Sequence, residues 1–180
     1  MFGPPVDLSF KDLHSVADAL LAVPRSGWRP LKTNSNGKYL SRSLRLSNNV
    51  ISDLAGLQHV CEHFLAQPWN IGWLDLSFNK ITCINPVVCE LRELRVLYLH
   101  GNDICELSEV DKLRELQYLQ AITLHGNTIE TNEKYRNHVI LTLPQLKTMD
   151  FSAVIREERD TANVWHHCSN RGKATNESLP

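Results

Sequence analysis

The chain has 180 residues and a mass of 20.5 kDa, the size of one domain with short additions. Nineteen basic and 20 acidic residues leave a net charge of -1, which excludes the basic composition of a general nucleic-acid-binding protein. No transmembrane run is present, and we expect no signal peptide in residues 1–5. Five cysteines, an odd number without a secretory signal, predict reduced thiols in the cytoplasm.

Residues 1–40 are predicted to form an N-terminal segment that contains a capping helix. A helix over Asp12–Leu21 would be amphipathic. Its apolar face would carry Leu13, Val16, Ala17, Leu20 and Leu21. We expect this helix to cover the first strand of the following region, and we expect Pro24 to end it.

Residues 41–133 contain one motif four times, beginning at residues 44, 74, 97 and 122. Each copy starts with aliphatic-x-aliphatic and ends with an asparagine two residues before an aliphatic. These asparagines are Asn49, Asn79, Asn102 and Asn127. Their spacings are 30, 23 and 25 residues. The last two lie within the ~20–29 residues of a leucine-rich repeat, and the first is slightly long. A fifth strand fits Leu146–Phe151, although Val154 replaces the asparagine.

This repeat predicts an α/β leucine-rich-repeat solenoid with about five short parallel strands on the concave face and helices on the convex side. The leucines of each strand point inward, and the residue between them faces the concave surface. Each asparagine is expected to satisfy backbone groups at the corner after its strand. Helical spacing is found at residues 54–65 and 111–116.

Residues 134–168 are predicted to form a C-terminal cap followed by a terminal helix over residues 156–167, and residues 169–180 a disordered tail. The run Tyr135–Ile140 followed by Leu143–Asp150 resembles the cap of the phosphatase regulatory subunit family. The resemblance implies that the helix with Tyr135 covers the last repeat and that Asp150 closes the final strand.

Several motifs outside the repeats resemble a smaller family. They are Pro4–Phe10, Pro24–Lys32, Asp150–Val154 and Arg159–Trp165. Together with the repeats, they are similar to the leucine-rich repeat-containing protein 51 family from Pro4 to about Trp165. The resemblance implies a non-catalytic cytoplasmic protein of ciliated and flagellated cells, associated with the axoneme.

Enzyme chemistry is not indicated, since the phosphate-binding and nucleophile-elbow motifs are missing. His100 and His125 occupy equal positions in successive repeats, which predicts a ladder of surface histidines. His59, Cys61 and His63 lack the four converging ligands of a zinc site; Cys61 is expected to be a buried apolar residue. We therefore expect no cofactor and no metal.

Charge is distributed unevenly along the chain. Residues 19–52 hold six basic and no acidic residues, whereas residues 53–133 hold twelve acidic and five basic ones. The basic stretch is either a solvated loop or an edge that binds an acidic partner, such as a tubulin surface. Trp28 lies within this stretch and would give it an apolar contact with a partner. The candidate contact residues of this stretch are Arg25, Trp28, Arg29 and Lys32.

The concave face is the second candidate binding surface. Its predicted contact residues are Arg45, Trp73, Asp75, Tyr98, His100, Thr123 and His125. An exposed pair formed by Trp73 and Tyr98 would favour binding, because aromatic residues dominate interaction hot spots. The alternative is that the N-terminal segment covers either ring. Five strands give a strip of about 20 Å, enough for one helix or loop of a partner.

These features predict a non-catalytic protein–protein interaction module in a ciliary or flagellar axoneme, with no nucleic-acid, membrane or small-molecule partner. Two alternatives remain. The cap favours a regulatory subunit of a protein phosphatase, although such a subunit needs a longer groove. The other is an enzyme with an unrecognised site.

Overall fold

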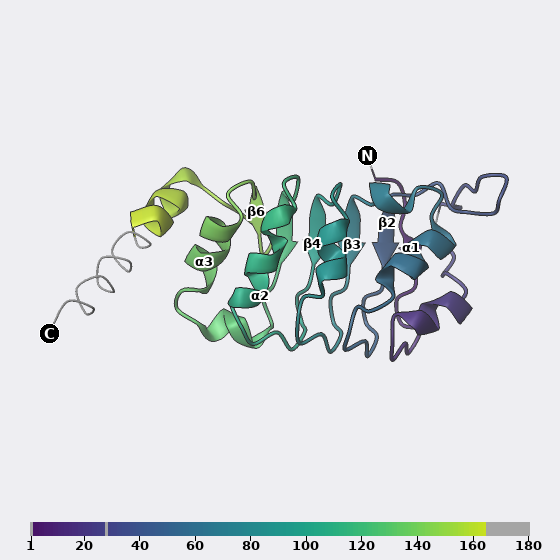
Figure 1. The fold of residues 1–180 in the computed structure, drawn as a ribbon, viewed down its shortest axis with the longest axis horizontal. Helices are drawn as coiled ribbons and strands as arrows, with labels where there is room; N and C mark the ends of the chain where they lie inside the picture. Colours follow the sequence, from purple (N-terminus) through teal and green to yellow (C-terminus); the bar gives the residue numbers. More distant parts are fainter. Residues whose placement is uncertain (1, 28, 165–180) are drawn as a thin grey trace, which may run out of the picture.

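In the computed structural model, which describes residues 2–27 and 29–164, the chain forms a curved stack of strands (Figure 1). One seven-stranded sheet runs in sequence order. Its strands are β1 (Val6–Asp7), β2 (Ser43–Arg45), β3 (Trp73–Asp75), β4 (Val96–Tyr98), β5 (Ala121–Thr123), β6 (Thr148–Met149) and β7 (Ser152–Ala153). Strands β1 to β6 pair in parallel, and β7 pairs antiparallel with β6. The predicted α/β solenoid is confirmed, with one additional strand at each end.

The core lies between the sheet and the convex elements. The strand register aligns one aliphatic residue from each repeat, and all of these residues are buried. They are Val6, Leu44, Leu74, Leu97, Ile122 and Met149. Burial of such a column excludes water along the whole stack, and each Leu-sized side chain contributes roughly 1.5–3 kcal/mol.

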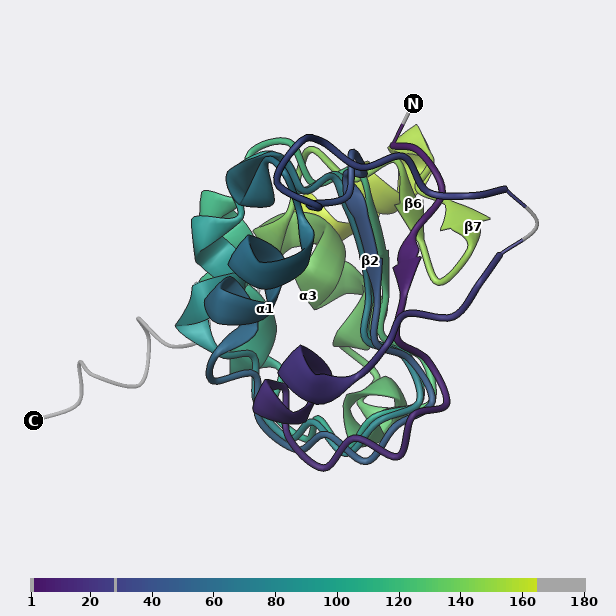
Figure 2. The same cartoon turned by 90° about the vertical axis from the view of Figure 1, so that its right-hand side faces the viewer.

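The convex side is built from short elements (Figure 2). It comprises α1 (Leu57–Phe64), η2 (Pro68–Asn70), η3 (Pro86–Glu90), α2 (Ser108–Asp111), η4 (Lys112–Glu115), η5 (Thr128–Thr131) and α3 (Tyr135–Thr142). The helix expected over residues 54–65 is therefore shorter. The segment expected to be a helix over 111–116 is a 3₁₀ helix over Lys112–Glu115, which continues the single α turn Ser108–Asp111. Repeats of 23 and 25 residues leave little chain for a full α-helix after the strand and its corner.

The predicted N-terminal helix over residues 12–21 is wrong for its first half. Only η1 (Ala17–Leu21) is helical, and Leu21 is 93% exposed. The preceding backbone is used elsewhere: Leu13 N–H donates to Asn49 Oδ1 (3.2 Å), and Leu13 O accepts from Val50 N–H (3.0 Å). These cross-chain hydrogen bonds hold Leu13 against the first repeat and prevent a helix from starting there.

The asparagines form a ladder along the stack. Asn102 shows the pattern: its Oδ1 accepts from Ile81 N–H (3.0 Å), and its Nδ2 donates to Leu76 O (3.0 Å) and Leu99 O (2.9 Å). Asn79 and Asn127 make the equivalent bonds one repeat before and after. Each asparagine thus joins its own repeat to the preceding one.

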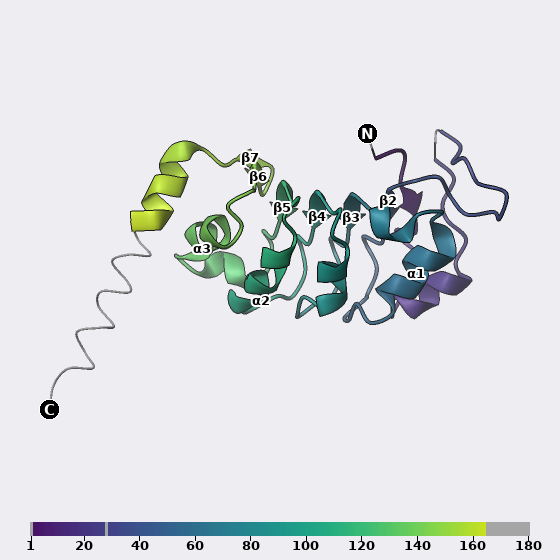
Figure 3. The same cartoon turned by 45° about the horizontal axis from the view of Figure 1, so that its top comes forward.

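The C-terminal end is closed by α3 and by the β6–β7 hairpin. Asp150 accepts hydrogen bonds from Leu124 N–H (2.7 Å), His125 N–H (3.0 Å) and the Tyr135 hydroxyl (2.8 Å). Burial and the Asp150 carboxylate raise the pKa of Tyr135 far above its ordinary value, so the hydroxyl keeps its proton. Residues 156–164 form a further helix beyond this cap (Figure 3). The remainder of the predicted terminal helix and the predicted tail lie outside the described residues.

Candidate protein-interaction site

One local motif occurs twice beside the concave face. Asp7–Phe10 and Asp75–Phe78 share the sequence Asp-Leu-Ser-Phe. In both, the aspartate Oδ1 accepts from the N–H (3.0 and 3.1 Å) and the hydroxyl (2.6 Å in each) of the serine two residues later. Arg45 lies on the strand between them, with guanidinium nitrogens 3.7 Å from Asp7 and 3.3 Å from Asp75. The two carboxylates therefore hold Arg45 in place.

Three phenylalanines project from strained backbone around this face. Phe10, Phe78 and Phe151 have φ angles of 55°, 54° and 62°. Their side chains are nevertheless 65%, 54% and 63% exposed. A left-handed backbone is unfavourable for a bulky side chain. Because more than half of each residue is exposed, burial of the ring offsets only part of that free-energy cost. Such outliers cluster at functional sites.

Aromatic rings touch one another along the concave face; we call Trp73, Phe78, Tyr98, His100, His125 and Phe151 the aromatic strip. The Trp73 and Tyr98 rings meet edge to face with centroids 5.6 Å apart, and Tyr98 meets Phe151 at 5.4 Å. The Arg45 guanidinium lies over the Trp73 ring, 5.2 Å from its centroid. These contacts fix the rings before any partner binds.

The strip surrounds an open basin of about 300 Å³. Its floor includes Ser47 and Ser77, and its walls include Phe10, Phe78 and Phe151. The floor is polar and the walls are aromatic, so the basin can accept a side chain with an apolar body and a polar tip. Phe10 and Phe78 follow strands β1 and β3, and Phe151 lies between β6 and β7, so the sheet positions each wall from the segment that adjoins it.

Two histidines stack at the C-terminal end of the strip. The His100 and His125 rings are 4.7 Å apart and inclined by 7°. His100 Nδ1 lies 2.7 Å from the Thr123 hydroxyl, and His125 Nδ1 lies 3.2 Å from Asp150 Oδ1. Burial, followed by the neighbouring His125, lowers the pKa of His100 below its ordinary value. A neutral His100 therefore supports the strip near pH 7.

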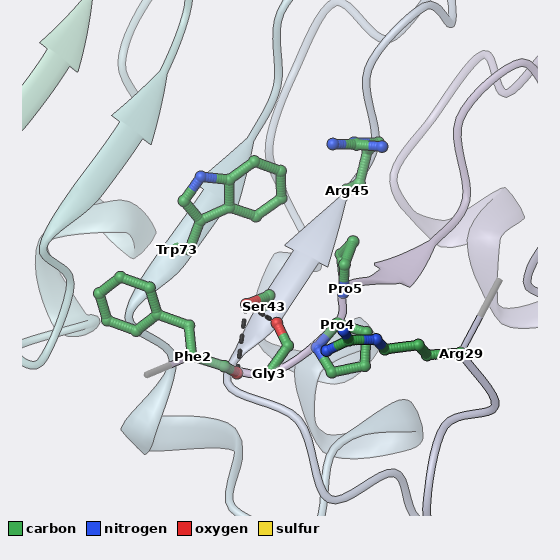
Figure 4. Close-up of a pocket in the computed structure, with 8 residues that line it drawn as sticks. All are labelled: Phe2, Gly3, Pro4, Pro5, Arg29, Ser43, Arg45 and Trp73. Carbon is green, nitrogen blue, oxygen red and sulfur yellow. Dashed lines mark hydrogen bonds between the residues drawn. The ribbon is translucent and has the colours of Figure 1, made fainter. Parts of the chain in front are cut away.

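A second cavity lies at the N-terminal edge of the strip, and we call it the N-terminal hollow (Figure 4). It has a volume of about 440 Å³ and includes Phe2, Arg29, Arg45 and Trp73 in its lining. Figure 2 shows the segment after η1 passing β1 to the side of the sheet opposite the helices. Arg25 N–H, in this segment, donates to Asp7 O (2.7 Å). The basic stretch and the concave face therefore adjoin.

The structure changes the role of several predicted contact residues. Asp75, His100 and Thr123 are buried. Arg45 and Ser77 contact the Asp75 carboxylate, and His100 and Thr123 are hydrogen-bonded to each other. These three residues position their neighbours and offer little area to a partner, which corrects the expected contacts and the surface location of His100. Arg45, Trp73, Tyr98 and His125 are partly exposed.

The predicted basic contact residues do not all lie at the same place. Arg25 and Arg29 both line a cavity beside Arg45. Lys32 is exposed but is absent from the linings of the cavities described above. Trp28 lies outside the described residues.

Sequence reasoning missed four phenylalanines: Phe2, Phe10, Phe78 and Phe151. For two of them a signal was present, since the Asp-Leu-Ser-Phe motif recurs in Asp7–Phe10 and Asp75–Phe78. The same alignment would have assigned β1 as a repeat strand. The position of Phe151 depends on the β6–β7 hairpin, and no sequence signal for that turn was recognised.

Other chemistry is limited. Cys61, Cys83, Cys89 and Cys105 are free thiols, and burial raises the pKa of Cys61 to about 12. Residues 2–27 and 29–164 contain no group of three or more histidine, cysteine or acidic side chains that could hold a metal ion. Within the same residues no helix has the length and apolar character required to span a bilayer.

The stacked strands, the asparagine ladder and the caps define a leucine-rich repeat protein, and residues 42–179 match the family model described as leucine-rich repeat. Leucine-rich repeat-containing protein 51 of Macaca mulatta is 48% identical over 162 residues, covering 90% of this chain and 84% of the relative. The Homo sapiens protein is 47% identical over the same length. The chain belongs to the leucine-rich repeat-containing protein 51 family.

Solved structures show the same fold. The crystal structure of the Drosophila melanogaster SNF/U2A′ complex contains a similar chain, with a TM-score of 0.63 and 24% identity, covering 86% of this chain and 85% of that one. Leucine-rich repeat proteins are in general non-catalytic, and the chain is a protein–protein interaction module.

Proposed function

We propose that the aromatic strip binds one helix or loop of a protein partner and that this contact builds the chain into a ciliary or flagellar axoneme. The axonemal assignment is supported by resemblance to the leucine-rich repeat-containing protein 51 family. The choice of surface is supported by the side chains of the concave face.

The three exposed phenylalanines carry the proposal. An asparagine or glycine occupies the equivalent left-handed position in other repeats: Asn48, Gly101 and Gly126 all have positive φ angles. A phenylalanine there costs more, and in Phe10 and Phe78 more than half of the surface stays exposed. Selection for an aromatic contact with a partner explains why Phe10 and Phe78 occupy such positions.

The neighbouring charges favour an acidic partner. Arg25 and Arg29 are exposed at the same end of the strip, and the stretch that contains them has no acidic residue. Electrostatic attraction would guide an acidic surface to the site, and the rings would then hold it. The acidic tails and surfaces of tubulin meet this requirement in an axoneme.

The alternative function, a phosphatase regulatory subunit, has weaker support. The cap built from Tyr135 and Asp150 has the expected form. However, six parallel strands at about 4.8 Å spacing give a concave strip of only about 24 Å. A strip of that length can hold one segment of a partner rather than a folded catalytic domain.

The test is rebinding of purified chain to salt-extracted axonemes. Trp73→Ala with Tyr98→Ala should abolish retention, since both central rings are lost. The matched control is Trp69→Ala with Tyr118→Ala, which removes two other exposed rings. Circular dichroism establishes that each variant is folded. Normal retention of the Trp73 and Tyr98 variant would contradict the proposed surface.

A further inference from the structure

We propose that the N-terminal hollow binds an apolar side chain of an acidic peptide segment, with a flanking carboxylate paired to Arg29. This inference rests on the proposed protein-binding function and specifies the chemistry of the partner segment. Four apolar side chains and two arginines carry the argument: Phe2, Pro4, Pro5, Trp73, Arg29 and Arg45 (Figure 4).

The interior of the hollow selects for an apolar group. Its polar floor atoms already have partners: the Ser43 hydroxyl donates to Gly3 O (3.2 Å), and the nearby Ser41 hydroxyl donates to Pro4 O (2.7 Å). A polar side chain entering the hollow would lose water without gaining these hydrogen bonds. A phenylalanine or leucine side chain loses nothing by the same transfer.

The size of the hollow is suited to a side chain. At about 440 Å³, it lies near the lower end of the ~300–1,000 Å³ typical of ligand sites. It is also open at one side, so the backbone that carries the inserted side chain can remain outside. A single anchor residue of a peptide meets both conditions.

The charge at the rim selects for a carboxylate. Arg45 is already held between Asp7 and Asp75. Arg29, by contrast, is exposed and forms no ion pair with any acidic residue among those described. Arg25 also lacks such a pair, and its guanidinium lies over the Phe10 ring at 5.5 Å. Arg29 therefore has its donors available for an acidic residue beside the anchor.

One wall of the hollow can be moved without touching the aromatic strip. The Phe2 ring lies against Gly72, where an added Cβ would approach Phe2 Cε1 to 2.5 Å. Gly72→Ala must therefore displace the ring. Because the atoms in the way are the far end of the partly exposed Phe2 side chain, the ring can move while the repeats keep their packing. Gly72→Ala is thus a change of shape at the hollow rather than a disruption of the core.

The experiment measures binding of a fluorescently labelled glutamate-rich peptide with one central phenylalanine to the full chain. Replacing that phenylalanine by alanine should weaken binding about tenfold or more, because the buried apolar area is lost. Replacing the glutamates by glutamines should weaken it and remove its salt dependence. Gly72→Ala and Arg29→Gln should each weaken binding severalfold, whereas the convex control Arg114→Gln should not.

Three results would overturn the inference. Absence of peptide binding would show that the hollow takes no such segment, and equal affinity for the alanine peptide would show that it takes no anchor. Tighter binding of a labelled single-stranded oligonucleotide would identify a nucleic-acid site. Failure of the proposed function is separable. If peptide binding meets every expectation while the Trp73 and Tyr98 variant is still retained on axonemes, the strip is not the docking surface. If that variant is lost from axonemes while no peptide binds, only the hollow is wrongly assigned.

Discussion

Single residues show where this protein departs from the simplest form of its repeat. Phe151 lies in the tight turn between β6 and β7, and both central residues, Asp150 and Phe151, have positive φ. Such turns favour Asn-Gly or Asp-Gly. The ring contacts Tyr98, His100 and His125 at centroid distances of 5.4–5.6 Å. The turn thus places an otherwise unfavourable phenylalanine over the strip.

This arrangement predicts that Phe151→Gly separates stability from binding. Glycine relieves a left-handed penalty of roughly 1–2 kcal/mol, while the lost ring contacts are those of a mostly exposed side chain. We expect the free energy of unfolding in urea to stay within about 1 kcal/mol of the wild type or to rise. Retention on axonemes should fall. A destabilised Phe151→Gly with unchanged retention would mean that the ring serves the fold instead.

The His100 side chain predicts a pH dependence of stability. Burial and His125 lower its pKa, an effect that Asp75 and Asp150 oppose. Between the folded pKa and the ordinary value of about 6.5, the unfolded chain binds more protons than the native chain. Stability should therefore fall as the pH drops below about 6.5 and stop falling on this account below the folded pKa.

The measurement compares urea denaturation of wild type and His100→Gln between about pH 7.5 and about pH 5. The chain contains eight histidines, so the difference between the two pH profiles isolates His100. The variant should lose less stability on acidification. Parallel profiles would show that His100 titrates alike in the folded and unfolded chain.

At the scale of the element, the asparagine ladder joins strands that are otherwise linked only by two or three residues of pairing. Asn102→Leu should leave Ile81 N–H and the carbonyls of Leu76 and Leu99 without their present partner, at a cost of about 1–3 kcal/mol per buried group. Thermal unfolding would measure the loss. The control is Asn36→Leu, because Asn36 is exposed. An Asn102 variant that melts with the control would remove the ladder as a source of stability.

Strands β2 to β5 were predictable because their signal is local and periodic. In each of these four repeats, a buried aliphatic residue at every second position and an asparagine at the corner are visible in the sequence. The convex elements were less predictable. The spacing of apolar residues in a run such as Asp111–Leu116 fits both an α-helix and a 3₁₀ helix. The helix prediction for residues 12–16 failed for a different reason. The Leu13 backbone forms hydrogen bonds with Asn49 and Val50, which lie more than thirty positions away in the sequence.

The candidate site was predictable only in part. Trp73 and Tyr98 follow from strand alternation. The register pairs Trp73 with Val96 and Asp75 with Tyr98, so the two rings are diagonal neighbours on one face, and their edge-to-face contact depends on side-chain orientation as well. Burial of Asp75 and Thr123 did not follow, since it depends on which neighbours close over each side chain. The N-terminal hollow is formed by Phe2 packing on Gly72, a contact between distant residues that no periodicity encodes.

Over the whole molecule, charge is polarised along the stack. All six charged side chains in residues 19–52 are basic, and residues 53–133 have a net charge of -7. The basic segment adjoins the hollow and one end of the aromatic strip, whereas exposed acidic residues of the convex side, such as Glu106 and Glu115, belong to the middle repeats. Under the proposed function, an acidic partner would be attracted to the N-terminal end and repelled by the middle, and this would set its direction of approach.

The polarity predicts that charges and rings control different rate constants. Arg25→Glu with Arg29→Glu should slow rebinding to salt-extracted axonemes about tenfold at low salt, because steering is reversed. The association rate of the wild type should fall as salt rises, while that of the variant should change less or increase, since screening weakens its repulsion. Loss of Trp73 and Tyr98 should instead accelerate release, because buried rings mainly determine dissociation. Time courses of binding and wash-out measure both. If the arginine variant and the wild type share one salt dependence, the basic segment does not face the partner, and binding must be driven by the concave rings alone.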